Sequence, residues 1–218
     1  MVSGIAVASP VRATVIDHEG WFQVTATGPV AGRWRAFLEA QPRIGARPDA
    51  DGVGMRAFLG RGAVGYDVGG GWSLWQGYGW TPTFQPYRVE HRSFQQALYD
   101  RRVGPFETSN RTRIEQRWIE GVHGVALRVR HQLRIAYPLP RRPEWSLVVA
   151  DEPFVNLNSA TDGPVSGFEQ NRLYAGISRK IGRHLRVEVD YLNQVVNGRR
   201  DQEATMRHSG VLQLAFGW

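Results

Sequence analysis

The sequence predicts an all-β protein, folded as a single antiparallel up-and-down β-barrel of about 12 strands (about 10–12) with a polar, arginine-rich interior. Polar and apolar side chains alternate over long segments, most regularly across residues 110–137, and a period of two is typical of a β-strand. Most of these segments have about 10–14 residues, whereas soluble strands average about 5–6 and strands of membrane barrels need about 9–11. No segment of useful length shows the periodicity of a helix.

Each expected strand is an alternating segment bounded by turns that contain glycine or proline. The strands expected are, in chain order, 21–28, 33–43, 55–66, 72–81, 89–100, two within 110–137, 144–156, 168–180, 184–196 and 208–218. The connections expected are a looser segment at 44–54, loops at 81–88, 157–167 and 197–207, and turns at 28–32, 67–71, 101–107, 121–124, 138–143 and 181–183. This count is odd, whereas membrane barrels of bacteria have an even number of strands, so we expect either a further strand before Trp21 or a miscount of one strand.

The alternation within single strands shows which side chains share a face. One face carries Trp34, Ala36, Leu38 and Ala40 in strand 33–43, Trp72, Leu74, Gln76, Tyr78 and Trp80 in strand 72–81, Leu185, Val187, Val189 and Tyr191 in strand 184–196, and Leu212, Leu214, Phe216 and Trp218 in the last strand. In these strands the apolar face is opposite a polar one, so one side of the sheet is apolar and the other is charged.

Residues 1–20 are expected to form a poorly ordered leader, and residues 21–218 the single barrel domain. The leader has a short apolar piece and a small-residue cleavage point after Ala13, but no basic region before the apolar piece. We therefore interpret it either as the remnant of a signal peptide or as an ordinary disordered terminus.

The charge distribution argues against a nucleic-acid partner. The net charge is +7, and Lys180 is the one lysine among 27 basic residues. These arginines alternate inside strands, whereas nucleic-acid patches usually form clusters or tails. The chain has no cysteine, which excludes a disulfide framework and a thiolate metal site.

No catalytic or cofactor motif is visible, so we expect no enzyme activity, no cofactor and no metal. His91, His123, His131 and His208 are scattered, and none forms a nucleophile–base–orienter set. Glu188 and Asp190 share a face, where carboxylates more often balance neighbouring arginines.

The cost of placing arginine in lipid decides which face is the inner one if the barrel spans a membrane. One arginine on the lipid face costs about 2–4 kcal/mol at mid-membrane. Arg128, Arg130 and Arg134 together would cost about 6–12 kcal/mol, comparable to the stability of a whole domain. A transmembrane barrel must therefore turn these arginines into its lumen. The alternative is a soluble periplasmic ligand-binding β-barrel, with its apolar face inside and its arginines outside.

Aromatic residues near strand ends favour the transmembrane interpretation, since Trp and Tyr gather at both interfaces of membrane barrels. The expected membrane-interface aromatics are Trp34, Trp72, Trp80, Trp118, Tyr137, Trp145, Tyr191 and Trp218. The last strand alternates and closes on an aromatic residue, which is the signal that outer-membrane barrels present to the barrel-assembly machinery. The expected partners are therefore that machinery and outer-membrane lipid.

Short motifs carry a resemblance to a known family. They are, in this order, Arg33-Trp34-Arg35, Gln41-Pro42-Arg43, Trp75-Gln76-Gly77-Tyr78-Gly79-Trp80, Glu90-His91-Arg92, Arg111-Thr112-Arg113-Ile114-Glu115-Gln116-Arg117, Asp151-Glu152-Pro153-Phe154, Gln170-Asn171-Arg172 and Tyr191-Leu192-Asn193-Gln194. As an ordered set over residues 21–218, they resemble the domain-of-unknown-function 2490 family of Gram-negative outer-membrane β-barrel proteins. The resemblance implies a fold and an outer-membrane location, not an activity. The chain departs from it in its incomplete secretion signal and at Pro153, where we expect a bulge or a strand end.

The turn near 121–122 sets a register that brings charges together. It places Glu115 opposite Arg128 and Arg113 opposite Arg130, and the adjacent turns extend this to a belt Arg92–Glu115–Arg128–Glu152. The lumen ion network expected is Glu90, Arg92, Arg111, Arg113, Glu115, Arg117, Arg128, Arg130, Arg134, Glu152, Arg172 and Glu188. Buried charges must be paired, so the network is interpreted as a structural plug, with a narrow anion-preferring pore as the second possibility.

Overall fold

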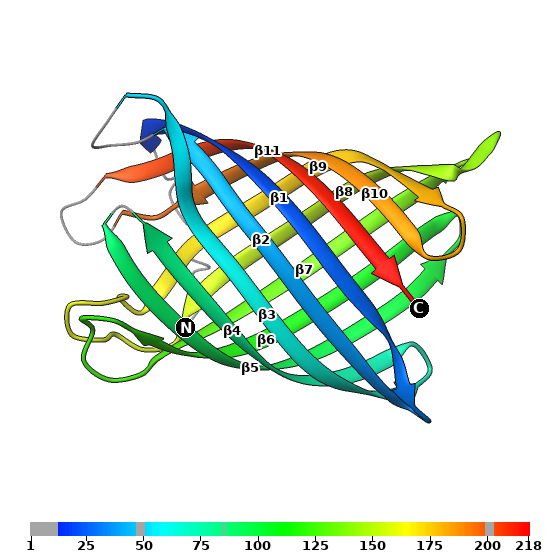
Figure 1. Cartoon of the computed structure of the whole chain (residues 1–218), viewed down its shortest axis with the longest axis horizontal. Helices are drawn as coiled ribbons and strands as arrows, with labels where there is room; N and C mark the ends of the chain where they lie inside the picture. Colours follow the sequence, from blue (N-terminus) through cyan, green and yellow to red (C-terminus); the bar gives the residue numbers. More distant parts are fainter. Residues whose placement is uncertain (1–12, 47–50, 85, 199–202) are drawn as a thin grey trace, which may run out of the picture.

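A computed structural model describes residues 13–46, 51–84, 86–198 and 203–218, with side chains from residue 16 onward. These residues form a closed barrel of 11 strands (Figure 1). The strands are β1 (Ala13–Ala31), β2 (Trp34–Ala46), β3 (Val53–Gly69), β4 (Trp72–Phe84), β5 (Tyr87–Val103), β6 (Phe106–Ile119), β7 (Ala126–Leu139), β8 (Arg142–Asn156), β9 (Gly167–Ile181), β10 (Leu185–Val196) and β11 (Ala204–Gly217). Among the described residues there is no helix long and apolar enough to cross a membrane.

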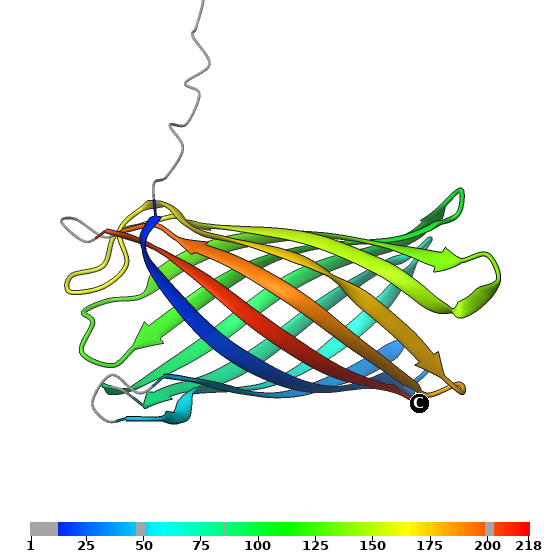
Figure 2. The same ribbon diagram turned by 90° about the horizontal axis from the view of Figure 1, so that it is seen from above.

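The barrel closes through a parallel pair. Each strand pairs antiparallel with its neighbours in the chain, and β1 pairs in parallel with β11. Figures 1 and 2 show these two strands side by side and running in the same direction. An odd number of strands that reverse direction at each turn leaves the first and last strands parallel. The expectation of a further strand before Trp21 therefore needs correction. Within the described residues this segment is not a separate strand but the first part of β1.

The expected leader 1–20 also needs correction. Residues 1–12 lie outside the described residues, but residues 13–20 belong to β1. The parallel ladder with β11 satisfies the backbone of this segment, and the Asp17 carboxylate lies 3.5 Å from the guanidinium groups of both Arg56 and Arg207. Charged partners on two other strands therefore anchor a segment that looked like a leader from its composition.

The two ends of the barrel differ in their connections. The end with the turns 32–33, 70–71, 104–105, 140–141 and 182–184 is called the turn end. At the opposite end, called the loop end, β2 is followed by β3, β4 by β5 and β10 by β11, and the connections 120–125 and 157–166 lie there. The turn 120–125 is tied to the connection 157–166 by a bridge between His123 and Thr161.

Most of the expected connections are shorter than predicted, because the flanking strands extend into them. Within the expected loop 81–88, β4 continues to Phe84 and β5 begins at Tyr87, and the turn 101–107 is reduced to residues 104–105, because the flanking strands continue to pair. Pro82 is accommodated in this ladder opposite Val89, and the hydroxyl of Thr83 donates to the carbonyl of Arg88. A proline near a strand end does not stop the strand when its missing donor is not needed by the ladder.

The inner face is charged and the outer face is apolar. Arg113 and Arg130 are 2% and 4% exposed, whereas Leu133 and Val189 are 39% and 53% exposed. The few apolar side chains inside, such as Phe94, are packed closely: a Cβ at Gly77 would lie 2.1 Å from the ring of Phe94. The apolar surface that alternation assigned to one side of the sheet is therefore the outside of the barrel.

Candidate functional site

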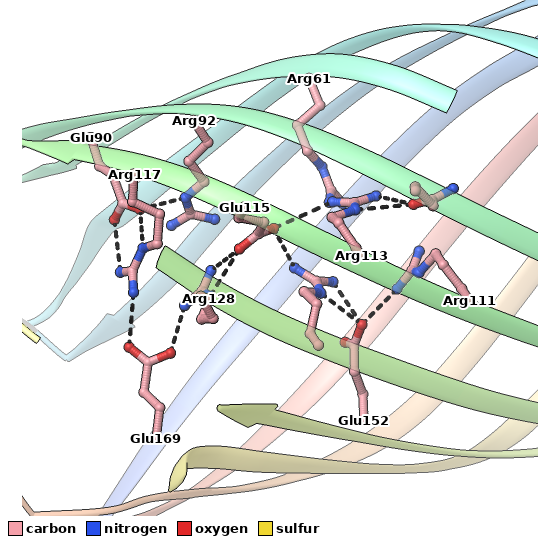
Figure 3. A network of polar contacts seen from close by, with 12 residues as sticks. Arg61, Glu90, Arg92, Arg111, Arg113, Glu115, Arg117, Arg128, Glu152 and Glu169 are labelled. Atoms are coloured by element: carbon pink, nitrogen blue, oxygen red, sulfur yellow. Dashed lines mark hydrogen bonds and ion pairs between the residues drawn. The ribbon is translucent and has the colours of Figure 1, made fainter. Parts of the chain in front are cut away.

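The inner face of β5 to β9 holds a continuous network of arginine and glutamate side chains (Figure 3). Glu115 lies at its centre and is 1% exposed. Its carboxylate accepts a hydrogen bond from Nε of Arg128 at 2.8 Å and a longer one from Nη1 of Arg130 at 3.4 Å. Nη1 of Arg113 lies 3.7 Å from the same carboxylate. One buried carboxylate therefore serves three guanidinium groups.

From Glu115 and its three arginines, a branch of the network runs through Arg128 towards the loop end. Arg128 donates to Glu169 at 2.7 Å, and Glu169 also accepts from Arg117 at 3.1 Å. Arg117 continues to Glu90 at 2.6 Å, and Glu90 accepts from Arg92 at 2.6 Å. The planar guanidinium fork lets each arginine bridge two carboxylates, which joins strands that are far apart in the sequence.

Another branch reaches β8 through Glu152. Its Oε1 accepts from Nε of Arg130 at 2.9 Å and from Nη2 of Arg111 at 2.8 Å. Glu152 is 1% exposed, so this carboxylate is as deeply buried as Glu115. Because each carboxylate is shared between strands, the network fixes the register of the sheet as well as neutralising charge.

The network differs from the expected belt in two links. Glu115 is opposite Arg128 and Arg113 is opposite Arg130, the register that the turn at 121–122 predicted. However, Arg92 bonds Glu90 instead of Glu115, and Glu152 bonds Arg130 and Arg111 instead of Arg128.

The registers of β5 and β8 explain this difference. β5 is displaced from the predicted register by two residues and β8 by four. Phe94 stands opposite Glu115, and Asn156 stands opposite Arg128. Slippage of two or four residues keeps the same face inward but changes the partner.

Three of the expected network residues lie apart from it. Arg134 of β7 and Glu188 of β10 form a separate ion pair on the inner face. Arg172 lies over two aromatic rings, 4.9 Å from the ring centre of Trp21 and 4.7 Å from that of Phe154. The structure therefore places all twelve expected residues inside the barrel but divides them between one network, one pair and one unpaired arginine.

Sequence reasoning missed Glu169, which connects two arginines of the network. Alternation from Gln170 and Arg172 would turn Glu169 outward. In the structure the register between β8 and β9 shifts, so that Phe154 pairs with Gln170 and Val155 with Phe168. Glu169 is the extra residue of this β-bulge, and the bulge turns its side chain inward. Pro153, two residues before Val155 on β8, was the one available signal, since it predicted a bulge in this region.

The effect of Pro153 is close to what was expected. The strand does not end there, because β8 continues to Asn156. The ladder to β7 lacks pairs between Asp151 and Phe154, and the bulge to β9 follows directly after Phe154. Since proline donates no backbone hydrogen bond, the irregularity is spread over both neighbouring strands.

Aromatic rings inside the barrel contact the same guanidinium groups. Arg113 lies 4.0 Å from the ring centre of Phe94, and Arg130 lies 4.7 Å from that of Phe154. Phe94 and Phe154 are 1% and 0% exposed. Such cation–π contacts stabilise charged groups that water cannot reach.

A cavity of about 400 Å³ lies among these side chains. Its lining is strongly cationic, with ten arginines and three glutamates. The arginines are Arg43, Arg61, Arg92, Arg111, Arg117, Arg128, Arg130, Arg134, Arg172 and Arg207, and the glutamates are Glu152, Glu169 and Glu188. Arg61 has its own carboxylate outside this set, Glu39, at 2.5 Å. The interior therefore combines a closed network with an open, positively charged space.

The aromatic residues expected at the interfaces lie on the outer face. Trp34, Trp72, Trp80, Trp118, Tyr191 and Trp218 are exposed, and Tyr137 and Trp145 are partly exposed. Several have aromatic partners on the neighbouring strand: Trp34 with Tyr66, Trp72 with Tyr99 and Phe106 with Tyr137 at the turn end, and Trp80 with Phe58 towards the loop end. Aromatic rings thus form two groups, one towards each end of the barrel.

Polar side chains on the outer face are hydrogen-bonded to each other. Gln95 donates to Gln76 at 2.8 Å and accepts from Gln116 at 2.9 Å. The ring Nδ1 of His131 lies 2.8 Å from the hydroxyl of Thr112. Pairing satisfies the amide and imidazole groups without water, which lowers the cost of an apolar surrounding.

Comparison with known proteins identifies relatives of unknown role. A family model described as "Protein of unknown function (DUF2490)" matches residues 18–205. The chain is also 37% identical over 199 residues to an uncharacterized protein of Methylorubrum extorquens, MexAM1_META1p0181, covering 87% of this chain and 81% of that protein. No solved structure matches the chain.

Proposed function

Given that this chain belongs to the DUF2490 family of proteins of unknown function, we propose that it is an integral β-barrel of the bacterial outer membrane. In this proposal the outer face contacts lipid, and the arginine–glutamate network closes the loop-end half of the lumen. The outward apolar side chains of β11, among them Leu212 and Leu214, are the ones that the barrel-assembly machinery would contact.

The observation that carries the proposal is the inverted distribution of side chains. Leu38, Leu74 and Val149 lie on the outer face at 62%, 54% and 50% exposure. Arg113 and Glu115 lie inside at 2% and 1%. Soluble monomers rarely leave apolar patches larger than a few hundred Å² in water, whereas a bilayer would solvate this face.

The spacing of the aromatic groups supports the same conclusion. The eight-residue step from Trp72 to Trp80 on β4 corresponds to about 26 Å along the strand, and to about 20 Å along the barrel axis at a tilt of about 40°. The apolar band of outer-membrane barrels is about 25 Å tall. The distance between the aromatic groups therefore suits the hydrocarbon thickness of such a membrane.

The alternative, a soluble periplasmic barrel that binds a ligand, requires an apolar interior. Buried Arg130 and Glu152 count against it, because both would be costly in such an interior. Extraction separates the two proposals. A membrane barrel should need detergent for extraction and should migrate differently on a gel before and after boiling. A protein that is monodisperse without detergent would overturn the membrane proposal.

A narrow anion-preferring pore is the second candidate function, and the excess of arginine in the cavity lining favours it. Reconstitution into planar bilayers tests it. With the network intact we expect little or no conductance, because Arg117 and Arg128 are bonded to Glu169 inside the lumen and fill part of it. The double substitution Arg117→Ala with Arg128→Ala should raise conductance and give a reversal potential that favours anions. If folded wild-type protein carries a steady, anion-selective current, the network does not close the lumen, and the protein is a pore.

A further inference from the structure

Arg172 is a buried cation that no described carboxylate contacts, although Glu152 stands opposite it in the ladder between β8 and β9. It is 8% exposed, and within the described part of the chain it makes no hydrogen bond and no ion pair. Its contacts are the rings of Trp21 and Phe154. The nearby carboxylate of Glu152 already accepts from two other arginines.

Arg43 lies against the same tryptophan and is also unpaired. Its guanidinium carbon is 3.8 Å from the ring centre of Trp21, and its hydrogen bonds go to the neutral amide oxygen of Gln41 at 3.0 and 2.7 Å. Among the described residues no carboxylate lies within ion-pair distance of it. Arg43 and Arg172 repel each other electrostatically, yet both line the cavity.

The surroundings of these two arginines are fixed and supply a further donor. Trp21 is 3% exposed and packs on Leu192 and Val211, and Tyr174 packs against the same cluster. Tyr174 lines the cavity, and its hydroxyl makes no hydrogen bond in the described part of the chain. Two guanidinium groups and one hydroxyl therefore open onto the same space with free donors.

Two like charges in a closed space are costly when no carboxylate contacts either of them, and a bound anion is the group that would complete this arrangement. We propose that the lumen beside Trp21 binds a small multivalent oxyanion, held by Arg43 and Arg172 and by the hydroxyl of Tyr174. A guanidinium fork matches two oxygens of one oxyanion, whereas chloride offers no such pair of acceptors. The cavity of about 400 Å³ has room for an ion of this kind.

This site goes beyond the proposed function and needs the folded barrel, not the membrane. Its test is titration calorimetry of the folded full chain in detergent micelles with inorganic phosphate at constant ionic strength, and with chloride as the comparison. Thermal stabilisation is a poor readout, because phosphate stabilises folded proteins without binding to a site. We expect saturable binding of phosphate at one site and no saturable heat with chloride.

Variants assign the binding to these residues. Arg172→Gln should weaken phosphate binding about tenfold or more, and Arg43→Gln with Arg172→Gln should abolish it, since a charged hydrogen bond contributes about 1.5–3 kcal/mol. Tyr174→Phe, which removes only a hydroxyl, should weaken it severalfold. Arg186→Gln removes the same charge near the turn end and should leave binding unchanged. Folding of each variant is checked by its heat-modifiable migration.

Three outcomes would overturn the site. They are phosphate binding that persists in the folded double variant, equal weakening by Arg186→Gln, or no saturable binding by the folded wild-type protein. None of these outcomes bears on whether the barrel inserts into membranes, so the site and the proposed function fail separately.

Discussion

The central carboxylate of the network gives the sharpest test of its structural role. Glu115→Gln keeps the shape of the side chain and removes its charge. Arg128 retains Glu169 and Arg130 retains Glu152, but Arg113 keeps only the neutral oxygen of Gln96, at 3.0 and 2.6 Å. The substitution therefore leaves one guanidinium, 2% exposed, without a carboxylate.

Removing one partner of a buried ion pair costs about 3–5 kcal/mol, because the remaining charge is left uncompensated. With an m-value of about 2 kcal/mol/M, the urea midpoint of Glu115→Gln should fall by about 1.5–2.5 M. The assay is equilibrium unfolding of the barrel in detergent micelles, with the folded fraction measured by heat-modifiable migration.

The matched control is Glu107→Gln at the turn end. Glu107 also pairs with two cations, Lys180 and Arg102, each at 3.0 Å, but these side chains are 42% and 68% exposed. Exposed pairs contribute about 0–1 kcal/mol, so this variant should unfold close to the wild-type midpoint. If Glu115→Gln unfolds within about 0.5 M of the wild type, or if both variants shift equally, burial does not make the network structural.

Two further predictions concern the packing inside and the surroundings outside. Gly77→Ala should destabilise the barrel by about 1–3 kcal/mol, because the added Cβ would lie 2.1 Å from the buried ring of Phe94. Gly210→Ala, where no atom lies within 4 Å of the added Cβ, should have little effect, and similar urea midpoints for the two variants would contradict this packing. Val149→Lys, on the outer face at the middle of β8, should cost about 2–4 kcal/mol in lipid vesicles, whereas Val165→Lys in the loop 157–166 should be tolerated. Equal folding yields of both lysine variants in vesicles would place Val149 in water.

Alternation along the strands predicted the part of this structure that depends on local sequence. It assigned Arg113 and Arg130 to one face and Leu133 to the other, and the short turn near 121–122 was enough to set the register between β6 and β7. Both inferences use residues close in the chain. The pairing of Glu152 failed because the register between β7 and β8 shifts at Pro138 and Leu139, beside the turn, so that Asn156 and not Glu152 stands opposite Arg128. This offset of four residues leaves the pattern of faces unchanged.

The closure of the barrel lay beyond local patterns for a related reason. The pairing of β1 with β11 joins Ala13 to Ala204, and no turn connects the two strands. The composition of residues 13–20 resembled a leader, since the partners that make it a strand are on distant elements. Arg207, which reaches Asp17, is such a partner. Contacts of this kind appear only when the whole sheet is assembled.

The excess of arginine over carboxylate now has two different explanations in one lumen. Glu115, Glu152 and Glu169 each accept from two arginines or more, so a shared carboxylate accounts for much of the positive charge. Arg43 and Arg172 are outside this sharing, although Glu152 stands opposite Arg172 in the ladder between β8 and β9. A plug alone requires every buried cation to be paired. Unpaired cations at the wall of a cavity are instead what a binding site for an anion requires, and the lumen therefore combines a structural network with a group of cations suited to a ligand.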